Sequence, residues 1–305
     1  MSVEIRDGRF TEVVGSAMTY ERLAEGFLFL EGPLWDALHR RLLFSDIPAD
    51  TIYEWNEVDG VKTLRAPSGK SNGLAFDLDG QLLCCEHATS RLTRIEVDGG
   101  SSVLAHEHRG RELNSPNDVV VRSDGGIYFT DPTYGRMDFY GVPREPQLGF
   151  RGVYRVEPRS NELTLVADDF AQPNGLCFSL DERELFVNDT ERGHVRVFDV
   201  RGDGTLSGGR VWIDVTGEGE GAPDGMKLDR DGNLYCCGPG GIHVFDRAAR
   251  CLGVIRVPTP VANFTWGDDD RRSLFIAATG SLYRARVRTP GRPASAMTTG
   301  TPASA

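Results

Sequence analysis

The chain lacks the long apolar runs and the basic clusters that mark two large classes of protein. Among its 305 residues, no apolar stretch approaches the roughly 18 residues that a membrane-spanning helix needs. The net charge is −11 and no basic block occurs anywhere, whereas phosphate binding needs clustered lysine and arginine. The sequence therefore predicts neither a membrane protein nor a nucleic-acid-binding protein.

The six cysteines lack the spacing of a metal site or of a disulfide framework. No CxxC pair of the zinc-binding kind occurs, and two adjacent pairs, Cys84/Cys85 and Cys236/Cys237, end strand-like runs. Neighbouring side chains on a strand point to opposite faces, which favours small apolar fillers over a bonded pair. The first ten residues, MSVEIRDGRF, carry acids and no hydrophobic segment, unlike a secretory signal. We therefore expect a reduced, cytoplasmic protein.

A sustained helical period is also missing. From about residue 20 to 288, short runs rich in β-branched and aromatic residues alternate with polar turns. The 36 glycines and 16 prolines suit a turn-dense β protein. The sequence predicts an all-β fold.

Six times along the chain, an acidic or amide side chain opens the same pattern of apolar run, polar turn and second strand-like run. We call these side chains the leading residues: Glu31, Asn72, Asn117, Asn174, Asp224 and Asn263. The steps between them are 41, 45, 57, 50 and 39 residues. A period in that range with β-rich content is typical of a propeller of four-stranded blades. We expect one six-bladed propeller over residues 1–288.

The two ends of the chain carry separate expectations. The sixth repeat stops after its third strand, so the segment around residues 26–30 is expected to supply a fourth strand and close the ring. The segment 289–305 lacks large apolar residues except Met297 and is expected to be a disordered tail.

The third repeat carries an insertion, which lengthens its step to 57 residues. It lies between Asp131 and Gly152, is rich in aromatic residues and begins just after a strand end. A lid over the channel mouth is one interpretation; a surface loop or a subunit contact is the other. The oligomeric state is left open, and a dimer is compatible with the sequence.

Equivalent repeats would place the leading residues around one axis, as a ring of oxygen donors. Calcium takes six to eight oxygen ligands, and carboxylates and amide oxygens both serve. No histidine or cysteine holds a leading position, which argues against a tight zinc or copper site. Two carboxylates, Glu31 and Asp224, would balance one divalent cation. Asn-Gly and Asp-Gly pairs are also ordinary turn residues, which is the competing interpretation.

The segments that carry these residues resemble a known family. They are LEGPLWD (30–36), SNGLAFDLDGQLLCCEH (71–87), SPNDVVVRSDGGIYFTDPTYG (115–135), QPNGLCFSLDERELFVNDT (172–190) and APDGMKLDRDGNLYCCG (222–238). The chain is similar, over nearly all of residues 29–285, to the gluconolactonase family that also contains senescence marker protein (regucalcin) and luciferin-regenerating enzyme. FTDPTYG and CEH point toward its bacterial gluconolactonase branch.

The resemblance implies a six-bladed propeller with one divalent metal, usually Ca²⁺, at the axis, with Zn²⁺, Mn²⁺ and Mg²⁺ as alternatives. The implied ligands are Glu31, Asn174 and Asp224. Asn117 would bind directly or through water, and would then contact substrate. Vertebrate members carry a sugar-binding arginine two positions earlier, where this chain has Ser115.

The implied activity is hydrolysis of a sugar lactone, first of all D-glucono-1,5-lactone to D-gluconate. A carboxylate must accept a proton from the attacking water. Asp224 is the first candidate, and three acids that follow strand ends are alternatives: Glu86, Asp131 and Asp189. The expected substrate contacts are Asn72, Asn117, His87, Tyr134, Asp189 and Asn263.

Two other functions remain open. One is an esterase or phosphotriesterase that uses the same metal, and the other is a non-catalytic calcium-binding propeller. The repeats carry no WD or kelch pattern, which disfavours a binding scaffold. No Gly-x-Ser-x-Gly elbow occurs in a suitable context, which disfavours a serine hydrolase.

Overall fold

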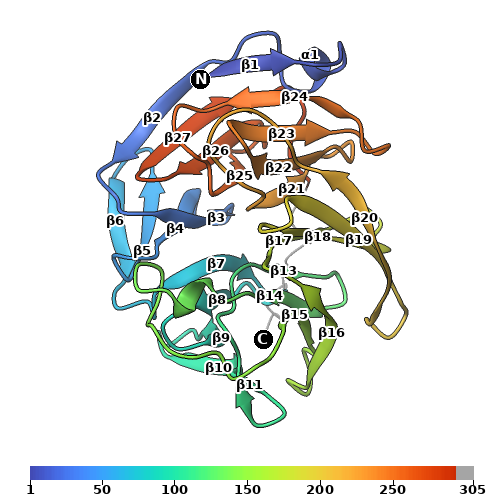
Figure 1. Cartoon of the computed structure of the whole chain (residues 1–305). Helices are drawn as coiled ribbons and strands as arrows, with labels where there is room; N and C mark the ends of the chain where they lie inside the picture. Colours follow the sequence, from blue (N-terminus) through green and yellow to red (C-terminus); the bar gives the residue numbers. More distant parts are fainter. Residues whose placement is uncertain (293–305) are drawn as a thin grey trace, which may run out of the picture.

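In the computed structural model, which describes residues 1–292, six β-sheets are arranged as blades around a central axis (Figure 1). The innermost strand of each blade begins within two residues of a leading residue, so each repeat of the sequence corresponds to one blade. The predicted six-bladed, four-stranded propeller is confirmed.

The first three blades are built in chain order, from the axis outward. Blade 1 contains β3 (Leu30–Asp36), β4 (Arg41–Asp46), β5 (Thr51–Asn56) and β6 (Gly60–Arg65). Blade 2 contains β7 (Ser71–Phe76), β8 (Leu82–Glu86), β9 (Arg91–Ile95) and β10 (Ser101–Ala105), followed by a hairpin of β11 (Glu107–His108) and β12 (Arg111–Glu112). Blade 3 contains β13 (Val119–Val121), β14 (Ile127–Asp131), β15 (Arg151–Val156) and β16 (Leu163–Phe170).

Of the other three blades, the last two each include a strand from the N-terminus. Blade 4 contains β17 (Pro173–Phe178), β18 (Glu184–Asp189), β19 (His194–Val200) and β20 (Leu206–Asp214). Blade 5 contains β21 (Met226–Leu228), β22 (Leu234–Gly238), β23 (Gly241–Phe245) and β24 (Cys251–Arg256), with β1 (Ser2–Ile5) added at its outer edge. Blade 6 contains β25 (Asn263–Gly267), β26 (Ser273–Ala278), β27 (Ser281–Arg286) and, outermost, β2 (Tyr20–Glu25).

The ring is closed by β2, which pairs antiparallel with β27 so that Tyr20 lies opposite Ala285. An N-terminal strand therefore completes the last blade, but the predicted segment 26–30 was wrong. Residues 26–29 link β2 to β3, and Leu30 already starts the innermost strand of blade 1. The outermost strand has few buried side chains, so its sequence, YERLAE, carries little hydrophobic alternation.

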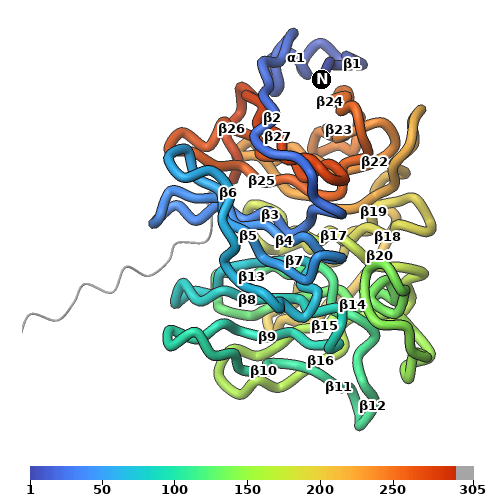
Figure 2. The backbone as a smooth tube through the Cα atoms, turned by 90° about the vertical axis from the view of Figure 1, so that its left-hand side faces the viewer, coloured from blue at the N-terminus to red at the C-terminus, as the bar shows by residue number. Residues whose placement is uncertain are grey.

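The N-terminal segment before β2 packs along the edge of blade 5 (Figure 2). Its short helix α1 (Phe10–Val13) inserts Phe10, which is fully buried, beside the core between blades 5 and 6. Aromatic side chains dominate that core, and Tyr235 and Trp266 meet edge to face at 4.8 Å between ring centres. None of the helices in residues 1–292 has the length and apolar character that crossing a membrane requires. All six cysteines are free.

Ordered contacts continue past residue 288, the predicted end of the propeller. The backbone N–H of Thr289 donates to the carbonyl of Val13, and Arg292 forms a 2.8 Å ion pair with Glu182. The rest of the predicted tail, residues 293–305, lies outside the described residues.

Close approach of the innermost strands explains the glycines that follow four leading residues. A Cβ on any of them would collide with the leading residue of the next blade; they are Gly32, Gly73, Gly175 and Gly225. The leading-residue–glycine pairs therefore serve backbone packing at the axis rather than an ordinary turn. This packing brings the leading side chains together at one end of the channel.

Candidate active site

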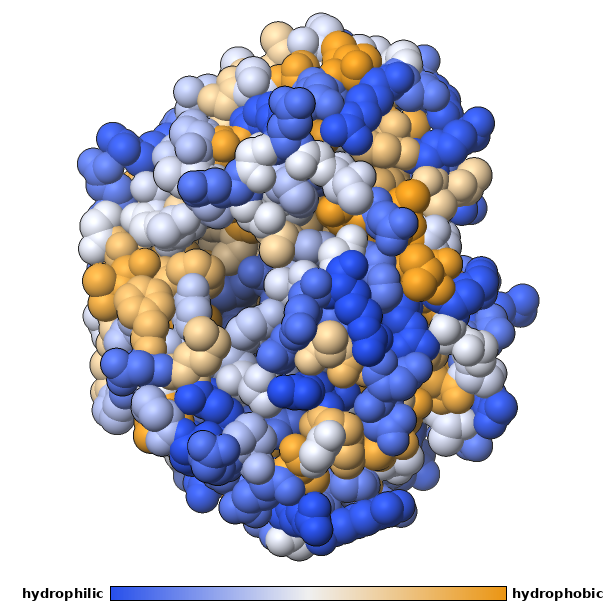
Figure 3. All heavy atoms as spheres, viewed as in Figure 1, coloured by the Kyte–Doolittle hydropathy of each residue, from blue (hydrophilic) through white to orange (hydrophobic). Residues whose placement is uncertain are grey.

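One mouth of the channel opens into a cavity of about 190 Å³. Its lining residues are Phe29, Glu31, Ile47, Asn72, His87, Asn117, Tyr134, Tyr140, Asn174, Thr190 and Asp224. Figure 3 views the molecule from the side of this mouth, where the surface is hollowed near the middle. Five of the six leading residues that the repeats place at the channel mouth line the cavity, and the sixth, Asn263, does not. His87 and Tyr134, which were expected to contact substrate, also line it.

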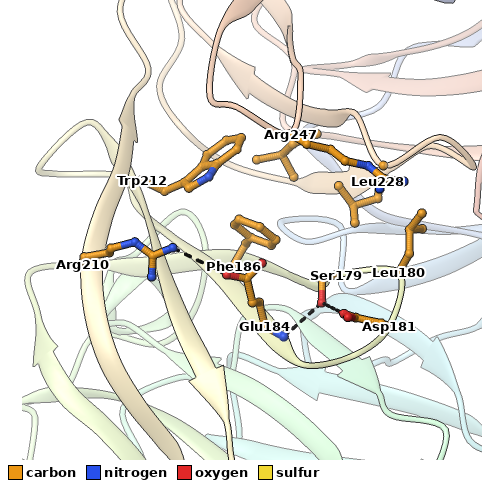
Figure 4. Close-up of a pocket in the computed structure, with 11 residues that line it drawn as sticks. Ser179, Leu180, Asp181, Glu184, Phe186, Arg210, Trp212, Leu228 and Arg247 are labelled. Carbon is orange, nitrogen blue, oxygen red and sulfur yellow. Dashed lines mark hydrogen bonds and ion pairs between the residues drawn. The ribbon is translucent and has the colours of Figure 1, made fainter.

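A larger cavity of about 330 Å³ lies between blades 4 and 5 (Figure 4). None of the leading residues lines it. Its acids already have partners: Glu184 lies 3.6 Å from Arg210, and Asp181 accepts a hydrogen bond from Ser179. Volume alone therefore does not locate the chemistry, and the axial cavity is the candidate site.

Two carboxylates meet at the axial cavity. Glu31 is buried, whereas Asp224 is half-buried and opens onto the cavity close to both Glu31 and Asn174. Burial raises the pKa of Glu31 to about 7. Burial, and then repulsion from Glu31 and Asp118, raises the pKa of Asp224 well above its usual range. The ionised form of two close, buried carboxylates is stabilised when a cation binds between them.

The donor set fits a hard divalent cation. Residues 1–292 hold no group of three or more histidine, cysteine, aspartate or glutamate side chains placed to bind a metal. A cation here would therefore be bound by two carboxylates supplemented by amide oxygens, and all these donors are of the class that Ca²⁺ prefers. No cysteine lines the cavity, and both nitrogens of His87, the histidine that lines it, already have partners within the protein.

The amide of Asn174 is turned so that its oxygen faces the axis. Its nitrogen donates to Oγ1 of Thr190 at 3.1 Å, and the Thr190 hydroxyl in turn donates to the Pro223 carbonyl at 2.6 Å. With the nitrogen held there, the oxygen is left for the cavity. Thr190 was not predicted as a site residue.

His87 orients Asn72 in the same way. Its Nδ1 lies 3.0 Å from the carbonyl oxygen of Tyr140, which can only accept, so Nδ1 carries the proton. Burial lowers the pKa of His87 to about 4, so the ring is neutral at pH 7. Its Nε2 therefore accepts from the amide nitrogen of Asn72 at 3.2 Å, and the Asn72 oxygen is free to face the cavity.

The third-blade insertion lies over the cavity. Its 3₁₀ turn η1 (Tyr134–Arg136) and Tyr140 both contribute to the lining. Gly135 lies so close to Ser115 and His87 that a Cβ there would collide with both. Burial raises the pKa of the Tyr134 phenol, which therefore stays protonated and able to donate. This placement agrees with the lid interpretation of the insertion.

The structure does not bring Asp131 or Asp189 into the cavity. Both end the second strand of a blade and accept hydrogen bonds from the backbone at the entry to that blade's first strand. Asp131 accepts from the N–H groups of Asn114 and Ser115, at 2.9 and 2.8 Å. Asp189 accepts from those of Ala171 and Gln172, at 2.8 and 3.0 Å. These carboxylates bind the backbone just before the first strand of their blade. That role differs from the predicted proton-accepting and substrate-binding roles.

Glu86 and Asn263 also differ from their predicted roles. Glu86 accepts from the hydroxyls of Thr89 and Thr93, at 2.5 and 2.8 Å, and does not line the cavity. Asn263 is buried beneath Glu31, to which its amide nitrogen donates at 3.0 Å. It therefore contacts a proposed ligand rather than the cavity where a substrate would sit.

Comparison with known proteins agrees with this geometry. A family model described as the SMP-30/Gluconolactonase/LRE-like region matches residues 29–280. The gluconolactonase of Zymomonas mobilis subsp. mobilis is 30% identical over 308 positions, which cover 93% of this chain and 85% of that protein. A solved gluconolactonase of Xanthomonas campestris has a TM-score of 0.87 at 33% identity and covers 94% of this chain and 95% of its own.

A more distant structure shares the fold alone. Regucalcin of Agrobacterium tumefaciens, described as a calcium-binding protein, has a TM-score of 0.77 at 19% identity and covers 92% of this chain and 97% of its own. The family match spans most of the propeller, and the relatives at 30% and 33% identity extend over nearly the whole chain. The chain therefore belongs to the SMP-30/gluconolactonase/LRE-like family.

Proposed function

We propose that this protein is a metal-dependent lactonase that opens D-glucono-1,5-lactone to D-gluconate. Lactone hydrolysis follows from the family and its gluconolactonase relatives; the sugar and the metal are the proposal. The observation that carries it is that Glu31, Asp224 and Asn174 lie together in the lining of a small cavity at the axis. Ca²⁺ is the proposed cation because every facing donor is an oxygen.

The residues that would hold the cation are Glu31, Asn174 and Asp224, with Asn117 binding directly or through water. When bound, the cation would supply Lewis-acid polarisation of the lactone carbonyl. Lys227 is the basic side chain whose charge acts on Glu31, and it lines the cavity at the opposite mouth of the channel rather than the axial cavity.

Asp224 is the proposed proton acceptor. Glu31 and Asp224 are the carboxylates that line the cavity, and Glu31 is the more buried and the more tightly held by hydrogen bonds. Water adds to the carbonyl carbon as Asp224 accepts its proton. The ring C–O bond then breaks, and the proton passes to the departing ring oxygen to give the open-chain acid.

The other cavity residues would bind the sugar and limit access of solvent. The free oxygen of Asn72 can accept from a sugar hydroxyl, and the protonated phenol of Tyr134 can donate to one. Both nitrogens of His87 are used within the protein, so we infer that it positions Asn72 rather than contacting the sugar. The cavity volume of about 190 Å³ favours a compact sugar lactone over a bulky phosphotriester.

The proposed function is tested by titrating the acid released from three substrate classes by Ca²⁺-loaded protein: D-glucono-1,5-lactone, an aryl acetate and an aryl phosphotriester. We expect the lactone to be turned over fastest, after subtraction of its spontaneous opening. Preference for the aryl ester or the phosphotriester would replace the lactonase assignment with the corresponding hydrolase. Absence of turnover on all three, with Ca²⁺ bound, would favour a non-catalytic calcium-binding propeller.

A further inference from the structure

A lysine lies on the side of the axial carboxylates that faces away from the axial cavity. Lys227, on β21, donates a hydrogen bond of 3.0 Å from its ammonium group to Oδ1 of Asn263. The same ammonium nitrogen lies 5.7 Å from the ring centre of Phe264. Lys227 is half-buried and faces the cavity at the opposite mouth of the channel. It therefore contacts neither the proposed substrate nor the proposed cation.

The hydrogen bonds around Asn263 determine which way its amide points. Oδ1 accepts from Lys227 and from the backbone N–H of Phe264, at 3.0 and 2.9 Å. A reversed amide would place its NH₂ group against these two donors and its oxygen against the carboxylate of Glu31. Its nitrogen is therefore directed at Glu31, to which it donates at 3.0 Å.

This donation fixes the Glu31 carboxylate. Oε2 of Glu31 accepts from Asn263 and also from the backbone N–H of Gly32, at 3.0 and 2.6 Å. With Oε2 held by two donors, Oε1 is the oxygen left for the axis. Groups that hold a metal ligand in place in this way commonly govern metal affinity as strongly as some ligands do.

We propose that Lys227 is a positioning residue that acts through Asn263 to orient Glu31 toward the axial cation. We call the chain of hydrogen bonds from Lys227 through Asn263 to Glu31 the relay. It rests on the cation of the proposed function, and it adds to that site two residues that do not line the axial cavity. Asn263, a leading residue, thereby belongs to the support of the site rather than to the substrate pocket.

A purely electrostatic role for Lys227 predicts the opposite effect of removing it. At a pH at which Glu31 is already ionised, the positive charge of Lys227 acts on the cation chiefly by repelling it, so Coulomb interaction alone predicts tighter cation binding once that charge is gone. The relay predicts weaker binding, because Asn263 loses the donor that sets its amide direction and Glu31 loses its fixed orientation. The sign of the change in affinity therefore separates the two roles.

The test is calorimetric titration of metal-free protein with Ca²⁺. Lys227→Met keeps the side-chain stem, and we expect its Kd to rise by about 10- to 100-fold, as for other residues that support metal ligands. Lys62→Met is the matched control, because Lys62 is exposed on β6, and its Kd should equal that of the parent protein. Because Lys227 acts through Asn263, Lys227→Met/Asn263→Ala should bind no more weakly than Asn263→Ala alone.

An unchanged or lower Kd in Lys227→Met would overturn the relay, while Ca²⁺ binding by the parent protein would leave the axial site standing. Additive losses in the double variant would also overturn it. Parent protein that binds no Ca²⁺ would contradict the relay and the proposed cation together. If Lys227→Met does not fold, Asn263→Ala carries the test: a rise in Kd of about 10- to 100-fold supports the relay, and an unchanged Kd overturns it.

Discussion

Asp224→Asn is expected to lower the rate of lactone hydrolysis by about 10³-fold or more, within or above the range typical of a lost general base. The amide has nearly the same shape as the carboxylate but cannot accept a proton from water at neutral pH. It also removes one of the two negative charges that face the proposed cation. Steady-state rates on D-glucono-1,5-lactone at saturating Ca²⁺ measure this loss.

Folding should survive the same substitution. Burial and the nearby Glu31 raise the pKa of Asp224, which means that the ionised form is disfavoured in the metal-free protein. A neutral amide removes that penalty, so the unfolding temperature of metal-free Asp224→Asn should equal or exceed that of the parent.

Glu86→Gln is the matched control for Asp224→Asn. Glu86 is also an acid near the axis, but its oxygens are bound to Thr89 and Thr93 outside the cavity. We expect less than about a tenfold loss of rate from it, because it takes no part in proton transfer. A large loss in Glu86→Gln together with near-normal rates in Asp224→Asn would reverse the assignment.

Deleting residues 1–25 is expected to abolish the cooperative unfolding transition. The deletion removes β2, which completes blade 6, and exposes the edge of β27. It also removes Phe10, whose loss from a core typically costs about 3–5 kcal/mol. Since domains are stable by only about 5–15 kcal/mol, an opened ring without this side chain should not stay folded.

Deleting residues 1–8 provides the comparison from the same terminus. It removes β1, a fifth strand on blade 5, but keeps Phe10 and the closing strand β2. Circular dichroism during heating should show a cooperative transition for this shorter deletion and none for the longer one. Cooperative unfolding of the protein that lacks residues 1–25 would show that β2 is dispensable for closure.

The blade architecture could be predicted because the repeat period reflects a real geometric equivalence. Each leading residue lies at or near the start of the innermost strand of its blade, and the glycine that follows four of them is needed where innermost strands approach closely. The outermost closing strand β2 could not be located, because a largely exposed strand carries weak hydrophobic patterning. β1 and α1 were missed because they depend on contacts with blade 5, far away in sequence.

The axial residues could be predicted from the same equivalence, but the direction of a side chain could not. Glu31, Asn174 and Asp224 converge as the repeats indicate. Asp131 and Asp189 share the position of a cavity acid in the sequence, yet their oxygens turn to their own blade's backbone. Sequence shows that an acid ends a strand, not which donors it meets.

One repeated signal could have identified Thr190. In blades 1, 2 and 4, the residue directly after the acid that ends the second strand lines the cavity: Ile47, His87 and Thr190. In blades 1 and 4 the acid accepts hydrogen bonds from the backbone at the start of the blade. In all three blades the next residue, where the chain leaves the strand, lines the cavity. Aligning the repeats at this acid, rather than only at the leading residue, would have located Thr190.

The central claim is that one cation, bound between Glu31, Asn174 and Asp224, is required for lactone hydrolysis. Its most direct test is stepwise addition of Ca²⁺ to metal-free protein, with the bound cation and the rate of D-glucono-1,5-lactone opening measured in the same samples. We expect no enzymatic rate at first, a linear rise, and a plateau at one cation per chain. Full activity in protein shown to hold no metal would contradict the claim.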